Sequence, residues 1–292
     1  MGDLAAQATP SWAEFIEGLE IFADPMLCGA AAGLVLGLVG VYIVLRRMVF
    51  VSAAITHSAG LGVALAFYGQ IHLGLGALAH PVLGAFTFGM GSTLLLTLNP
   101  ERIHLTRESV IGLVFIFASG AMLLVGDRIS QESHDIHAII FGTAVLVSRA
   151  DLYTTLAVGA VVLLGHLWLR RGIVFASFDP DGARVQRLPV GALDAFLLLS
   201  IGLMVSVTTR ALGAMPVFAF SVLPAAATLR AFDDVRWVIV GAAIVGAVSA
   251  FAGYWISFVF EFPTGACTVT VAGLFLVPAT LYRSLRQRSK TS

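Results

Sequence analysis

Two groups of residues in this sequence have the chemistry of metal ligands, and the first is His57. It lies about two turns into the apolar segment 50–69, just after the basic pair Arg46 and Arg47. A histidine deep in an apolar helix is costly unless it has a partner or faces water, and neutral imidazole commonly binds transition metals. The residue type alone leaves two interpretations open: a ligand on a path for metal ions, or a histidine hydrogen-bonded to a neighbouring helix.

The second group lies in the polar stretch 132–137. His134 and His137 are three residues apart and would share one face of a helix, with Glu132 and Asp135 beside them. This set is typical of a site that collects metal ions. The spacing by itself favours a solvated polar loop slightly more.

A short helix is predicted inside the segment 172–189. Asp179 followed by Pro180 is a good helix opening, and Pro189 can close the helix. A short helix that projects between two apolar segments is suited to dock into a groove of a partner protein. An ordinary connecting loop is the alternative.

Membrane-spanning helices are predicted to position these residues. Hydrophobic residues make up 58% of the chain and charged residues 12%, against about a quarter charged in soluble domains, so lipid must be the solvent. We predict an all-α, polytopic transmembrane helical bundle whose helices cross the membrane about nine times, near 26–45, 50–69, 80–98, 109–125, 150–169, 190–208, 214–229, 236–257 and 266–282. Eight crossings are possible if the brief interruption at 209–213 belongs to a re-entrant or broken helix.

The Lys and Arg residues predict the orientation of the bundle. With the N-terminus outside and the C-terminus in the cytoplasm, fourteen of the 17 basic residues fall on the cytoplasmic side, where such residues gather. Residues 1–25 contain no Lys or Arg and therefore do not resemble a signal peptide. Their apolar residues recur at helical spacing, so we expect 1–25 to be an amphipathic interfacial segment and 26–292 to be the transmembrane domain.

Small residues and motifs constrain the function further. Gly29, Gly33 and Gly37 recur every four residues, which predicts a close helix–helix contact, and Cys28 and Cys267 are expected to be buried free thiols.

The zero net charge gives no indication of nucleic acid binding. The sequence has no phosphate-binding G-x-x-x-x-G-K-[ST] loop, and its spans have few ionisable residues for a proton relay. If the chain moves a solute, we expect a separate subunit to supply the energy.

Several segments in order resemble one family, the membrane subunits of ABC importers for zinc and manganese. The residues that carry the resemblance are Arg46, Arg47, Met48, Phe50, His57 and Gly62; Glu108 with 111–115; Asp135 with 141–142; 151–152; Phe178, Asp179, Pro180 and Ala183; Gly213 with 223–227; and Glu261, Pro263 and Gly265. The similarity covers most of the chain.

The resemblance implies a permease subunit in the plasma (inner) membrane of a prokaryote. It implies a homodimer of the permease in membrane lipid, a cytoplasmic ABC ATPase as the engine and an extracytoplasmic metal-binding protein that delivers the cargo. The chain would not be an enzyme and would hold no permanent cofactor, because the divalent metal ion is cargo. Phe178, Asp179, Pro180, Ala183 and Arg184 would form the segment that couples to the ATPase.

The resemblance also makes His57 a ligand of the metal in transit. Four residues earlier, where the family has Asp, this chain has Ala53, and Ser52 replaces the usual Gly. Three explanations stay open: Glu261 near the outer mouth compensates, His134 and His137 supply further nitrogen ligands, or the cargo differs. The alternatives are a permease for a metal chelate, a secondary metal carrier, and a membrane-embedded enzyme or scaffold, although no acid–base set at one depth supports an enzyme.

Overall fold

The computed structural model describes residues 12–74, 79–97, 106–129 and 147–291, and every regular element in these ranges is a helix. The elements are α1 (Trp12–Leu45), α2 (Val49–His72), α3 (Pro81–Thr97), α4 (Arg107–Ile129), α6 (Arg149–Phe178), α7 (Pro180–Val185), α8 (Val190–Leu212), α9 (Ala214–Phe220), α10 (Leu223–Ala231), α11 (Val235–Phe260), α12 (Thr264–Leu274) and α13 (Leu276–Thr291).

The prediction of an all-α polytopic bundle is confirmed. Within the described ranges, eight segments are long and apolar enough to cross a membrane, and they match eight of the nine predicted crossings. The remaining crossing, 80–98, corresponds to α3, which is apolar but only 17 residues long. Helices are the natural solution here, because a helix satisfies its own backbone polar groups where lipid offers no partner.

Three details differ from the sequence expectation. The span expected at 214–229 is two short helices, α9 and α10, separated at Ser221 and Val222, and the last span is divided at Phe275 into α12 and α13. α8 continues through 209–212 and ends at Gly213, whose φ of 85° requires a residue without a Cβ. Helix α1 runs without a break from Trp12 through Pro25 into the first crossing, and an interfacial position for residues 1–25 stays a prediction.

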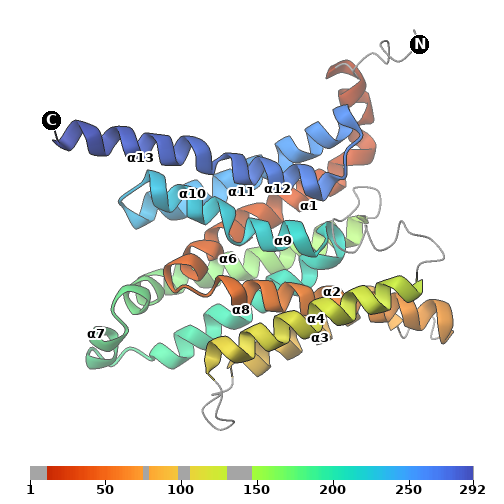
Figure 1. Ribbon diagram of the computed structural model, residues 1–292, viewed down its shortest axis with the longest axis horizontal. Coiled ribbons are helices and arrows are strands. Elements are labelled where there is room, and N and C mark those ends of the chain that lie inside the picture. The colour runs from red at the N-terminus through yellow and green to blue at the C-terminus, as the bar shows by residue number, and fades with distance from the viewer. Residues whose placement is uncertain (1–11, 75–78, 98–105, 130–146, 292) are drawn as a thin grey trace.

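The helices are arranged so that the arginine-rich turns lie together. Figure 1 shows α7, the α10–α11 turn and the end of α13 on one side of the bundle, opposite the start of α1. The α1–α2 turn, with Arg46 and Arg47, lies at the same side. We call this side the arginine-rich end; that it faces the cytoplasm remains a prediction.

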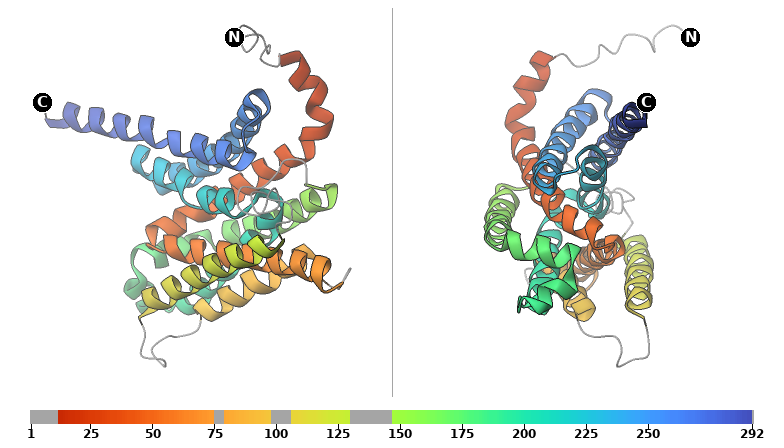
Figure 2. Two further views of the ribbon diagram at one scale, coloured as in Figure 1. Left: turned by 45° about the vertical axis from the view of Figure 1, so that its right-hand side comes forward. Right: turned by 90° about the vertical axis from the view of Figure 1, so that its left-hand side faces the viewer.

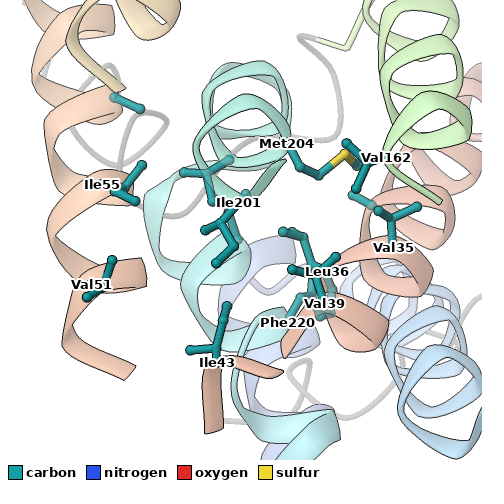
Figure 3. Close-up of a cluster of buried hydrophobic side chains, with 14 of the residues drawn as sticks. Val35, Leu36, Val39, Ile43, Val51, Ile55, Val162, Ile201, Met204 and Phe220 are labelled. Carbon is teal, nitrogen blue, oxygen red and sulfur yellow. The ribbon is translucent and has the colours of Figure 1, made fainter. Parts of the chain in front are cut away.

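Helices α1, α2, α6, α8 and α9 share one apolar core. Figure 2 shows α1 bending as it passes from the periphery into the middle of the bundle. Figure 3 shows its inner half meeting the other helices through tightly packed aliphatic and aromatic side chains: Val35, Leu36, Val39 and Ile43 of α1, Val51 and Ile55 of α2, Val162 of α6, Ile201 and Met204 of α8, and Phe220 of α9.

Helix α1 makes its closest approach to α11, as the glycine spacing predicted. A Cβ at Gly33 would overlap the backbone carbonyl of Gly246, and a Cβ at Gly37 would overlap that of Ala242. Where lipid is as apolar as the side chains, such close packing is a main source of helix association. The two glycines therefore fix the position of α1.

We predict that Gly33→Ala destabilises the protein. The added methyl meets backbone of α11, which no side-chain rotation can relieve, so we expect a loss of about 1–3 kcal/mol in the free energy of unfolding. Thermal unfolding of the purified chain in detergent measures it. Gly120→Ala is the control, because nothing lies within 4 Å of a Cβ there; equal melting temperatures for the two variants would contradict the packing.

Candidate functional site

His57 lies on α2 with one ring nitrogen already engaged. Its Nδ1 is 2.9 Å from the carbonyl oxygen of Ala53, one turn earlier. A carbonyl oxygen can only accept, so Nδ1 carries the proton and the neutral ring keeps the lone pair of Nε2 for another partner. The half-buried ring packs edge-on against Phe115 of α4, with ring centroids 4.8 Å apart. His57 therefore has the tautomer and the fixed orientation of a metal-binding imidazole.

A cavity of about 780 Å³ opens between α2 and α4 toward the arginine-rich end. Its wall includes Glu108, Ile111 and Gly112 of α4 and Val51 of α2. Glu108 precedes Phe115, the neighbour of His57, by seven residues, which places both on one side of α4. The α2–α4 face thus offers an imidazole deep in the bundle and, two turns away, a carboxylate in an open cavity.

The first turns of α2 are anchored to the break between α9 and α10. The hydroxyls of Ser52 and Ser221 lie 2.6 Å apart, and both side chains are fully buried. Ser221 donates to the carbonyl oxygen of Phe218 at 2.7 Å, so its single proton is used and Ser52 must be the donor between the two. Ser52, where the family resemblance expects Gly, thus holds α2 against the broken helix.

Arg46 joins three helices at the arginine-rich end. Its guanidinium group forms an ion pair with Asp194 of α8, and its Nε donates to the hydroxyl of Ser177 of α6 at 2.9 Å. Ser177 in turn donates to the carbonyl oxygen of Ile173 at 2.6 Å. The side chain of Arg46 is only 11% exposed, so the turn that leads into α2 is held firmly to α6 and α8.

Helix α7 follows directly after this contact. Asp179 caps it by accepting the backbone N–H of Gly182 at 2.8 Å, with Pro180 at the first helical position, as predicted. Ala183 is fully buried, whereas Phe178 and Val185 are exposed although they are apolar. Arg184 pairs with Asp181 at the surface at 2.8 Å. One face of α7 is thus fixed to the bundle, and apolar side chains stand free beside it.

Of the other predicted ligands, the structure describes only Glu261. His134, Asp135 and His137 lie outside the described residues. Glu261 is exposed in the turn after α11, at φ 54°, and the neighbouring Ser257 bonds to Thr264 and to the carbonyl oxygen of Phe262. In the ranges that the structure covers, no three His, Cys, Asp or Glu side chains form a group that could hold a metal. Metal ligation by Glu261 therefore stays a prediction.

Asp194 was not predicted from the sequence, although its position gave a signal. An acid four residues after the start of an apolar span needs a partner, but the sequence does not say which basic residue supplies it. A second ion pair joins Asp151 of α6 to Arg210 of α8 at the opposite end. Asp151 also completes a capping box with Ser148. The two pairs hold α8 near both of its ends.

The chain is similar to known membrane transport proteins over nearly its whole length. A sequence model of the ABC 3 transport family matches residues 19–283. The manganese transport system membrane protein MntC of Listeria monocytogenes is 29% identical, covering 92% of this chain and 94% of that protein. The chelated iron transport system membrane protein YfeD of Yersinia pestis is 31% identical over 91% and 89%. PsaBC of Streptococcus pneumoniae, solved with a Fab, matches with a TM-score of 0.79 at 25% identity, covering 94% of this chain and all of that one.

We predict that Asp194→Ala destabilises the protein by about 2 kcal/mol. The substitution leaves the guanidinium group of Arg46 without its anion. The cost in stability is smaller than for a fully buried pair, because Asp194 is 41% exposed. Thermal unfolding in detergent measures it. Asp181→Ala, which removes an exposed ion pair, should cost less than about 0.5 kcal/mol. Adding Arg46→Met to Asp194→Ala should restore part of the loss; no restoration would refute the proposed pairing.

Proposed function

The chain belongs to the ABC 3 transport family, and we propose that it carries a divalent metal ion across the membrane past His57. A member of this family is a multi-pass permease of the prokaryotic plasma membrane, a transport subunit and not an enzyme. It works with an ATPase and a substrate-binding protein. The single observation that carries the proposal is the orientation of His57: its Nδ1 is bonded to the carbonyl oxygen of Ala53, which leaves Nε2 for a metal ion, and the same α2–α4 face carries Glu108 in the wall of the cavity further along.

The cargo we propose is a divalent first-row transition metal, with manganese first. Relatives named for manganese transport are about 29% identical over nine tenths of the chain. Imidazole and carboxylate oxygen are both ligands for such ions. A metal chelate is the second candidate, because the relative named for chelated iron is 31% identical. Zinc is the third candidate, on the chemistry of the imidazole alone.

The path we propose runs along the α2–α4 face. An ion delivered by the binding protein at the outer mouth, near Glu261 and the stretch 132–137, would meet the imidazole of His57. It would leave toward the carboxylate of Glu108, which lines the open cavity together with Arg47 and with Arg46, whose charge is paired with Asp194. Two copies of the chain would enclose the path. The exposed apolar side chains of α4, including Ile116 and Phe117, offer a surface for lipid or for the second copy.

Coupling to the ATPase would pass from α7 to α2 through Arg46. The exposed Phe178 and Val185 and the exposed charges of Asp181 and Arg184 suit α7 for docking on a partner. Ser177, two residues before the cap of α7, bonds to Arg46, and Arg46 precedes α2 by three residues. A displacement of α7 by the ATPase would therefore shift the helix that carries His57.

We predict that His57→Ala abolishes most metal uptake. In proteoliposomes with the ATPase and the binding protein, uptake of manganese, zinc and iron should fall at least tenfold, because the free imidazole nitrogen is lost. His72→Ala, at the exposed end of the same helix, serves as the control and should transport normally. Uptake at the wild-type rate by the His57 variant would remove this residue from the path.

We predict that Ala183→Leu impairs both metal uptake and the ATP hydrolysis that the metal stimulates. The larger side chain has no room at a fully buried position and should displace α7. Metal uptake and metal-stimulated ATP hydrolysis should then fall together, several-fold each. Gly191→Ala is the control, since a Cβ there meets open space. If both activities of the Ala183 variant match those of the control, α7 is not the coupling segment.

A further inference from the structure

A groove between α6 and α11 at the arginine-rich end has no role in the proposed transport path. It has a volume of about 460 Å³, and its wall combines Arg170 and Arg171 of α6 and Arg236 of α11 with the apolar Val174, Phe175 and Ile239. Both helices pack against α1, which lies in contact with each of them. The groove therefore joins strong positive charge to an apolar wall.

The charge of this groove is not neutralised by the protein. In the part of the chain that the structure describes, none of the three guanidinium groups forms a hydrogen bond or an ion pair. One carboxylate, that of Asp234, also lines the groove, and it accepts the backbone N–H of Arg236 at 2.8 Å as the cap of α11. Three cations against one anion leave a net attraction for an anionic ligand.

Two tryptophans place the groove at the level of lipid headgroups. Trp168 of α6 is 86% exposed and stands two residues before Arg170, and Trp237 of α11 is 63% exposed and follows Arg236. Exposed tryptophans gather at the membrane–water boundary. On the membrane side of these residues, both helices expose aliphatic side chains at helical spacing: Val161, Leu164 and Leu167 on α6, and Val240, Ile244 and Val248 on α11.

We propose that this groove binds an anionic phospholipid, with its phosphate between the arginines and its acyl chains along the exposed aliphatic faces. Arginine recognises phosphate oxygens with paired, charge-assisted hydrogen bonds, and basic pockets between membrane helices suit such headgroups. A docked protein is the competing occupant, because Phe178 also touches the groove. The lipid is favoured because the arginines continue directly into the exposed aliphatic faces of α6 and α11, which suit acyl chains.

The test is lipid binding to the purified full-length chain by native mass spectrometry. Wild-type protein in mild detergent should retain phosphatidylglycerol in preference to phosphatidylcholine with the same acyl chains. The combination Arg171→Gln with Arg236→Gln removes one charge from each wall and should weaken phosphatidylglycerol binding about 30-fold. Arg230→Gln with Arg283→Gln removes two exposed charges at the same end but outside the groove, and should leave binding within twofold of wild type.

Further measurements distinguish lipid binding from the binding of a free phosphate or of a protein. Free glycerol phosphate should not displace the lipid, because it lacks acyl chains to contact the apolar wall. The proposal is overturned if the groove variant binds phosphatidylglycerol like wild type, if both double variants weaken binding equally, or if glycerol phosphate competes fully. It is also overturned if the groove variant loses affinity for the ATPase subunit while its lipid binding is unchanged.

Discussion

The guanidinium group of Arg46 imposes the constraint on which the arrangement of the arginine-rich end depends. An arginine that is almost buried beside membrane spans needs a partner for its charge, since removing one partner of such a group is costly. Asp194 and Ser177 supply partners from two different helices, α8 and α6, while Nη2 is buried without a hydrogen-bond partner among the described residues. The α1–α2 turn, the end of α6 and the start of α8 are thereby held in one register. This arrangement fixes the position of α2 and therefore that of His57.

The close contact between α1 and α11 also fixes the position of a helix, but it does so through backbone packing and not through an ion pair. Glycines at 33 and 37 let the two backbones approach without side chains between them, and no polar group is needed to hold them. Polar contacts are instead concentrated at the edges of the bundle and at the break between α9 and α10, where Ser52 meets Ser221. The protein thus combines a tightly packed middle with short polar links at the places where helices end or break.

Much of the fold could be predicted from composition and spacing, because lipid permits few alternatives to helices of a set length. The crossings, the glycine contact and the cap at Asp179 follow from local patterns, and the structure confirms them. The breaks at Ser221 and Phe275 were missed because their neighbours are as apolar as any span. Asp194 was missed because its partner lies 148 residues away, and sequence spacing does not indicate which helices pack together.

For the site, residue type identified His57, whereas only the structure shows which of its nitrogens is free. The sequence likewise places Glu108 near the start of a span. Only the structure shows that Glu108 lines the same cavity as the turn containing Arg46.

The central claim is that motion of α7 reaches α2 through Ser177 and Arg46, and the number of metal ions moved per ATP hydrolysed tests it most directly. Ser177→Ala removes one hydrogen bond to Arg46 and keeps the ion pair with Asp194 intact. In proteoliposomes with the ATPase and the binding protein, the account predicts that ATP hydrolysis continues near the wild-type rate while metal ions moved per ATP fall several-fold. An unchanged ratio at an unchanged hydrolysis rate would contradict it.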